Sequence, residues 1–99
     1  MTENHLYDLG RNVRKQLPEI DAYISLAEEA AELAQAATKM ARYLSGKNPT
    51  DKTLTEINDN LVEEFTDLMN VAKYVIGLET DPGMASFKMQ RWISRLKQA

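Results

Sequence analysis

The sequence predicts an all-α fold, and three observations support that prediction. Apolar residues recur at intervals of three and four along most of the chain, β-branched residues form no alternating run, and the few glycines and prolines fall between the periodic segments. The 99 residues fit one domain spanning 1–99, and we expect a four-helix bundle-like arrangement. Because so short a chain buries only a modest core, we expect oligomerisation to complete the bundle.

The first half of the chain predicts two helices. Leu6, Leu9, Val13 and Leu17 follow helical spacing, and Pro18 ends or kinks that first segment. The second helix is expected from about residue 19 to residue 44, where the turn-rich stretch SGKNPTDK stops it. Its many alanines form a surface that permits close approach of another helix: Ala27, Ala30, Ala31, Ala34 and Ala41.

The second half predicts two more helices. Thr53 and Glu56 have the spacing of a capping box, which marks the start of the third helix. That helix closes at Gly77 or at the TDPG stretch that follows. Its apolar positions recur at helical intervals: Ile57, Leu61, Leu68, Ala72 and Val75. The last helix covers roughly residues 84–97, with Phe87, Trp92 and Leu96 as its apolar side chains.

Composition excludes several classes of protein. A net charge of −3 and a pI near 5.1 leave no basic footprint for nucleic acid, so no nucleic-acid partner is expected. The absence of cysteine excludes disulfides and thiolate chemistry. The N-terminal MTENHLYDLG lacks the blocks of a signal peptide, and no apolar run is long enough to cross a bilayer. We therefore expect a cytoplasmic protein without a membrane partner.

Two acidic pairs fall at the edge of otherwise apolar helix faces. On a helical wheel Glu29 lies about 40° from Leu33, with Glu32 about 60° further round. Glu64 lies about 40° from Leu68 on the next helix, and Asp67 follows one turn later. Four converging carboxylates would repel one another unless a cation intervened, and Mg²⁺ prefers oxygen ligands of this kind. A solvated surface remains an equally good interpretation of this spacing, and it is the default interpretation for Glu28 and for Glu63, which points well away from the pair on its helix.

Other metal sites do not fit the composition. A di-iron site in a helix bundle needs Glu-x-x-His pairs on two helices, whereas His5 is the single histidine of the chain. A zinc site of the usual kind needs cysteine or several histidines, which are absent. An oxygen-only site for Mg²⁺, or for Mn²⁺ in its place, remains.

The acidic pattern resembles the EExxE…ExxD signature of MazG-like nucleotide pyrophosphohydrolases, which belong to the all-α superfamily that also contains dimeric dUTPases. Glu28, Glu29 and Glu32 match its first half, and Glu64 and Asp67 match the second. The stretches EEAAELAQAATK, GKNPT, LVEEFTDLM and KMQRWISRL are also similar to small single-domain members of phages and Gram-positive bacteria. Two features depart from the family pattern: a gap of 31 residues between Glu32 and Glu64, and Ala31 in place of a glycine.

The resemblance implies Mg²⁺-dependent hydrolysis of a nucleoside triphosphate to the monophosphate and pyrophosphate. The implied metal ligands are Glu29, Glu32, Glu64 and Asp67, and Glu28 joins them as a catalytic residue that orients water or a second ion. The triphosphate also needs cationic side chains. Lys39, about 20° from Glu32 on the wheel, and Lys88 and Arg91 on the last helix are the candidates, with Asn70 as a candidate hydrogen-bonding residue.

A non-catalytic helical module that mediates oligomerisation or senses nucleotides is the alternative function. The sequence leaves open the base and sugar of the substrate, the number of metal ions, and the choice between a homodimer and a homotetramer. For the three candidate cations, Lys39, Lys88 and Arg91, surface charge near a helix C-terminus is the competing interpretation.

Overall fold

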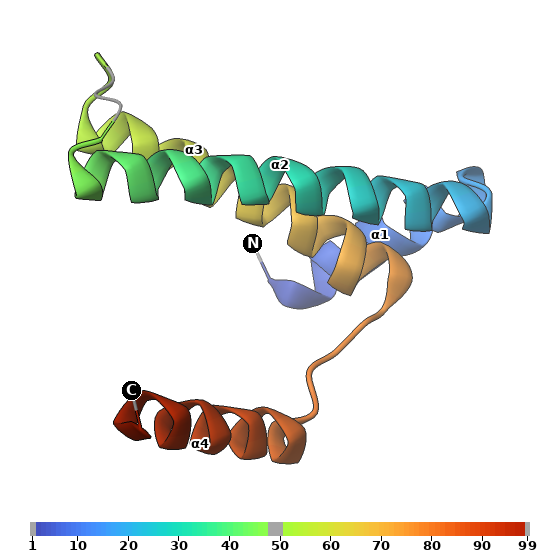
Figure 1. The fold of residues 1–99 in the computed structure, drawn as a ribbon. Helices are drawn as coiled ribbons and strands as arrows, with labels where there is room; N and C mark the ends of the chain where they lie inside the picture. Colours follow the sequence, from blue (N-terminus) through green and yellow to red (C-terminus); the bar gives the residue numbers. More distant parts are fainter. Residues whose placement is uncertain (1, 48–50, 99) are drawn as a thin grey trace.

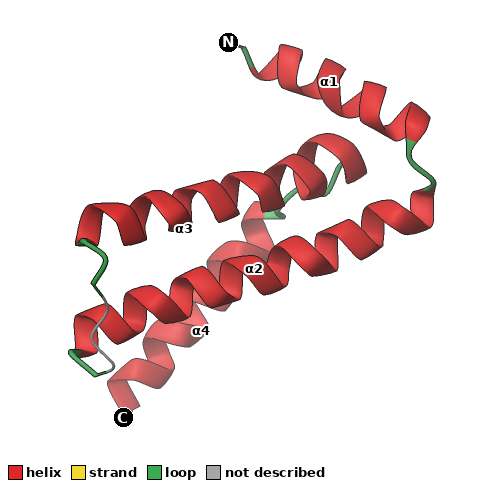
Figure 2. Ribbon diagram, turned by 90° about the horizontal axis from the view of Figure 1, so that it is seen from above, coloured by secondary structure: helices red, strands yellow, loops and turns green. Residues whose placement is uncertain are grey.

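The computed structural model describes residues 2–47 and 51–98, and across these two ranges it contains helices and no strand (Figure 2). The prediction of an all-α fold is therefore confirmed. The GKNPT segment lies largely outside the described residues. Five helical elements follow in order: α1 (Glu3–Gln16), α2 (Glu19–Ser45), α3 (Leu54–Met69), the π-helical turn η1 (Asn70–Ile76) and α4 (Pro82–Gln98).

Local signals fix the ends of the first two helices. The backbone N–H of His5 donates to the Thr2 side chain at 3.3 Å, which caps the start of α1. Leu17 adopts an extended conformation before Pro18, as expected for a residue that precedes proline, and the chain restarts as α2. Gly46 ends α2 with a φ of 72°, a left-handed conformation that glycine adopts without strain. The predicted boundary at Pro18 is confirmed.

The predicted capping box at the start of α3 is also present. Glu56 N–H donates to Thr53 Oγ1 at 3.1 Å, and Thr53 N–H donates to the Glu56 carboxylate at 3.2 Å. At its C-terminal end α3 widens directly into η1. The Ala72 carbonyl then accepts hydrogen bonds from Gly77 N–H at 3.1 Å and Leu78 N–H at 2.8 Å, and Gly77 ends the helix with a φ of 90°.

Helices α2 and α3 form an antiparallel pair that holds most of the tertiary contacts (Figure 1). The buried apolar residues are few, and two of them are alanines: Ala22, Ala36, Ile57 and Val75. Helix α1 packs on η1 at the other end of the pair. Gly10 permits this close approach, because a Cβ placed there would lie 1.9 Å from the Tyr74 carbonyl oxygen. The rings of Tyr7 and Tyr74 meet edge to face beside it, with centroids 5.0 Å apart.

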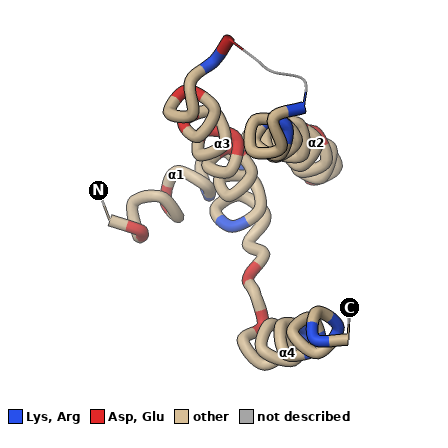
Figure 3. Tube along the Cα trace, turned by 60° about the vertical axis from the view of Figure 1, so that its left-hand side comes forward, with Lys and Arg blue, Asp and Glu red and all other residues tan. Residues whose placement is uncertain are grey.

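Helix α4 lies apart from the other helices (Figures 1 and 3). None of its residues is buried. Within one chain the described helices therefore form an α1–α3 body and a separate arm, and they do not close into a four-helix bundle. None of the described helices is both long enough and apolar enough to cross a membrane.

Candidate metal centre

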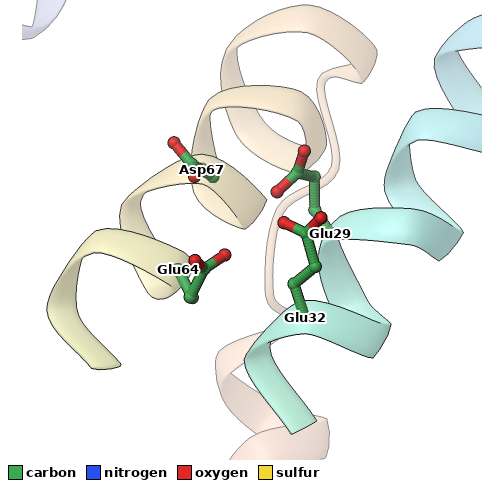
Figure 4. Close-up of side chains that lie close together, drawn as sticks. All are labelled: Glu29, Glu32, Glu64 and Asp67. Carbon is green, nitrogen blue, oxygen red and sulfur yellow. The ribbon is translucent and has the colours of Figure 1, made fainter. Parts of the chain in front are cut away.

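Two helices bring four carboxylates together at one place. Glu29 and Glu32 project from α2, and Glu64 and Asp67 lie across from them on α3 (Figure 4). One carboxylate oxygen from each of the four lies within 4.8 Å of the others. These residues are the two acidic pairs that the sequence predicted, and the structure places them face to face.

The i,i+3 spacing of each pair explains this convergence. Residues three apart on an α-helix lie on nearly the same side, one turn above the other. The buried residues Ala36 and Ile57 lie on the sides of α2 and α3 that face each other. Glu29 and Glu64 are close enough to those sides to be half-buried, whereas Glu32 is exposed at the rim.

Two atoms of the cluster lack any polar partner. The Oε2 atoms of Glu29 and Glu64 are buried, and neither accepts a hydrogen bond. A buried carboxylate oxygen without a donor is costly in free energy. None of the four carboxylates forms an ion pair with a described residue; Lys73, on η1, contacts Glu3.

The electrostatics of the cluster agree with this geometry. Burial raises the pKa of Glu29 above its usual value, and the nearby charges of Glu32 and Asp67 raise it further. Burial is also the first cause of the raised pKa of Glu64, and the neighbouring Glu32 adds to it. Both shifts run in the direction expected of carboxylates that lose hydration beside other negative charges.

The donor set fits a hard divalent cation. All four groups offer oxygen, and among the described residues no nitrogen or sulfur ligand joins them. A cation among these oxygens would supply the missing partner for the two buried Oε2 atoms and would offset the mutual repulsion. The solvated-surface interpretation accounts less well for side chains whose oxygen atoms are buried without partners.

Glu28 and Lys39, also on α2, lie outside the group of four carboxylates. Glu28 is exposed and does not belong to the four-carboxylate cluster. Lys39 is also exposed, two turns beyond Glu32, and with Arg42 it lines a surface hollow of about 370 Å³. A lysine side chain at this spacing can extend along the helix toward the acidic edge.

The other predicted substrate-binding residues do not belong to the cluster. Asn70 begins η1 and lines a cavity of about 180 Å³ beside α1, together with Gly10 and Tyr74. Lys88 and Arg91 are exposed on α4, the helix that stands apart from the α1–α3 body. A single chain therefore does not bring these two cations to the carboxylates.

The sequence did not predict the π-helical turn η1, which begins at Asn70, three residues after Asp67. Inserting a wider turn changes the side on which the following residues emerge. The chain can thus aim Asp67 at α2 and then direct Tyr74 toward α1. The apolar spacing continues through this segment, so the sequence gives no signal for the widened turn.

No protein-family model, curated protein or solved structure matches this chain.

Proposed function

We propose that the protein is a Mg²⁺-dependent nucleoside triphosphate pyrophosphohydrolase that releases a nucleoside monophosphate and pyrophosphate. The convergence of four carboxylates, with one oxygen of each within 4.8 Å of the others, is the single observation that supports the proposal most strongly. The resemblance of the acidic signature to MazG-like enzymes supplies the reaction class.

In this proposal Glu29, Glu32, Glu64 and Asp67 hold the metal. Mg²⁺ bound there would supply positive charge to the triphosphate oxygens and lower the pKa of a coordinated water. Mn²⁺ satisfies the same oxygen-only donor set. The half-buried position of Glu29 and Glu64 keeps the ligand atoms in a fixed arrangement, while the exposed Glu32 leaves one side of the cluster accessible to substrate.

The protein's own cations have a separate task in this proposal. Phosphoryl chemistry of this kind needs positioning and charge stabilisation rather than a nucleophilic side chain. Lys39 is the candidate within the same helix pair, because it extends along α2 from Glu32. Lys88 and Arg91 lie on α4, which projects away from the body of its own chain (Figure 3). They can contribute to the site only if α4 changes its position or if another chain brings its α4 near the carboxylates.

The direct test has two separate readouts. Calorimetric titration with Mg²⁺ or Mn²⁺ measures binding to the carboxylates, and a panel of NTPs and dNTPs, including modified bases, measures pyrophosphate release. We expect binding and turnover, both lost in Glu64→Gln. Glu63→Gln is the matched control, since Glu63 neighbours Glu64 on α3 and is exposed outside the cluster.

The two readouts separate the candidate functions. Metal binding without turnover of any nucleotide would favour the non-catalytic nucleotide-sensing module. Absence of both metal binding and turnover would refute the proposal. Turnover that survives Glu64→Gln would assign the activity to another part of the chain.

A further inference from the structure

Helix α4 carries an apolar face that nothing in its own chain covers. Along the helix, the residues within an arc of about 100° include Met89, Trp92, Ile93 and Leu96. Trp92 is 64% exposed and Leu96 is 63% exposed. An amphipathic helix normally buries such a face against a partner.

The exposed area of the whole chain is too large for a compact monomer. It exposes 7895 Å², whereas a folded monomer of its mass of 11.2 kDa is expected to expose about 5,700 Å². Its radius of gyration is 17.0 Å, against about 13 Å for a compact domain of this length. The excess of about 2,200 Å² per chain exceeds the roughly 800 Å² that each partner buries in a standard interface. It is in the range of obligate homodimers.

A second exposed apolar face lies on the α2–α3 pair. On α2 it consists of small residues, among them Ala30, Ala34 and Ala37, all of which are exposed. On α3 it consists of Val62 and Phe65, which are 56% and 52% exposed. The close helix approach that the sequence predicted for the alanines is therefore not made within the chain.

The α2 alanines and the α3 residues Val62 and Phe65 form two rows of apolar side chains, one on each helix. The two rows lie on the same side of the helix pair. Each row is displaced by about 100°, in the same rotational sense, from the side of its helix that faces the other. Because α2 and α3 run antiparallel, equal rotations in the same sense lead to one common side. Glu32 and Asp67 are displaced in the opposite sense, so this apolar face lies on the side of the pair away from the carboxylates.

The two faces complement each other in size and charge. Large side chains on α4 match a surface of alanines, into which bulky residues can pack closely. Helix α4 holds four basic residues and no acidic one, which gives it a charge of +4. The chain carries −3 in total, so residues 1–81 carry −7. A basic arm placed on a second acidic body reduces the repulsion between two such bodies.

The connection to α4 directs it away from its own body. Gly77 caps η1 at one end of the linker, and Asp81 caps α4 at the other by accepting from Met84 N–H at 3.0 Å. The five linker residues 77–81 are thus held between two capped helix ends, and α4 projects as an arm (Figures 1 and 3).

We propose that α4 is an exchanged arm. Its apolar face packs on the apolar α2–α3 face of a second copy of this chain, and the second copy returns the contact. A two-fold axis then relates the copies, because the same two faces are used reciprocally. The interface is independent of the carboxylate cluster.

Engineered disulfides test the contact directly, because the chain has no cysteine of its own. Chains carrying Met89→Cys are mixed under oxidising conditions with chains carrying Ala30→Cys, Ala34→Cys or Ala37→Cys. We expect at least one mixture to give a covalent species of twice the 11.2 kDa chain mass that contains one chain of each kind. Ser94→Cys, on another side of α4, is the control and should not cross-link to these alanine positions.

A charge insertion tests the energetics. Trp92→Glu with Leu96→Glu should raise the dissociation constant of the dimer at least about 100-fold, measured by light scattering across a dilution series. Ser94→Glu should leave it unchanged. Circular dichroism checks that the α1–α3 body is retained, since no α4 residue is buried in it.

Four results would overturn the proposal. The first is a monomeric mass for the unmodified chain at every concentration. A monomer in which α4 packs on the α1–α3 body of its own chain would give this result. The second is a dimer that survives the double glutamate variant. The third is cross-linking of Met89→Cys chains only with one another, which would indicate contact between two arms. The fourth is failure of all three alanine positions to cross-link.

Discussion

Glu29 on α2 and Glu64 on α3 approach each other across the helix pair, and the Oε2 atom of each is buried without a hydrogen-bond partner (Figure 4). Burial raises the pKa of both side chains. Without a bound cation we expect this arrangement to cost stability, because two anionic groups lose water and gain no donor. Removing the charge of Glu29 or of Glu64 should therefore raise the stability of the metal-free fold and weaken metal binding.

The first prediction concerns Glu64→Gln. Without metal, the variant should melt at a higher temperature than the wild-type protein at neutral pH, because one repelling charge is removed from the cluster. With Mg²⁺ it should lose the metal-induced rise in melting temperature. Pyrophosphate release should fall at least about 100-fold, since the metal supplies several kcal/mol of charge stabilisation.

The neighbouring Glu63→Gln serves as the control for that experiment. It removes the same charge from the same helix at an exposed position outside the cluster. We expect metal binding and activity close to wild type. Equal losses in both variants would mean that the general charge of α3, rather than the cluster, attracts the metal.

The second prediction is that Mg²⁺ stabilises the fold in a concentration-dependent way. At a free concentration of 100 times the dissociation constant, binding to the native state alone adds about 2.7 kcal/mol. For a domain of this size that gain corresponds to a melting-temperature rise of about 10–20 °C. Differential scanning fluorimetry in a Mg²⁺ series measures it, and EDTA should reverse it. A melting temperature that does not change on addition of Mg²⁺ or Mn²⁺ would contradict a metal site.

Much of the fold could be predicted because its signals are local. Pro18, the Thr53–Glu56 capping box and Gly77 each act within a few residues, so the sequence places these helix boundaries closely. The acidic pairs were also accessible, because i,i+3 spacing fixes each pair on one side of its helix. That the two pairs lie opposite each other depends on how α2 and α3 align, and the resemblance rather than the spacing favoured it.

Other features depend on long-range packing and could not be predicted from local signals. The approach of Gly10 to Tyr74 joins positions 64 residues apart. A single glycine in a helical pattern does not indicate which segment of the chain will pack against it. The separation of α4 was equally inaccessible, because an amphipathic pattern shows that a face will be buried but not which surface will bury it. The predicted roles of Lys88 and Arg91 remain predictions for this reason.

The third prediction concerns Lys39→Ala. If Lys39 contacts a substrate phosphate, removing its charge should raise KM about tenfold or more, since a hydrogen bond to a charged group contributes about 1.5–3 kcal/mol. Binding of Mg²⁺ alone should be unchanged, because Lys39 lies outside the cluster. Arg42→Ala, which alters the same surface hollow one turn further along, is the control. An unchanged KM would remove Lys39 from the substrate site.

The fourth prediction is a pH dependence that arises from Glu3 and Lys73. Their contact joins α1 to η1, and Lys73 lowers the pKa of Glu3 below 4.5 while Glu3 raises that of Lys73. Stability from a carboxylate with a lowered pKa is present above the unfolded value and is lost as pH falls through the folded value.

We therefore expect the melting temperature to fall on acidification below pH 4.5, with a smaller fall in Glu3→Gln. The effect should be small, because exposed ion pairs contribute little and are screened by salt. Thermal melts of both proteins from neutral to acidic pH measure the difference. Parallel curves for the two proteins would show that the contact does not contribute to stability in solution.

The fifth prediction distinguishes steric fit from helix propensity. Replacing glycine by alanine inside a helix normally stabilises it by about 0.5–1 kcal/mol. Gly10→Ala should instead destabilise by about 2 kcal/mol or more, because the new Cβ would lie 1.9 Å from the Tyr74 carbonyl oxygen and neither backbone can yield easily. Gly83→Ala is the matched control: its Cβ meets only the flexible Asp81 side chain at 3.4 Å, so it should be neutral or mildly stabilising. Chemical denaturation measures both changes. If Gly10→Ala were as stable as Gly83→Ala, α1 would not pack on η1 in solution as it does here.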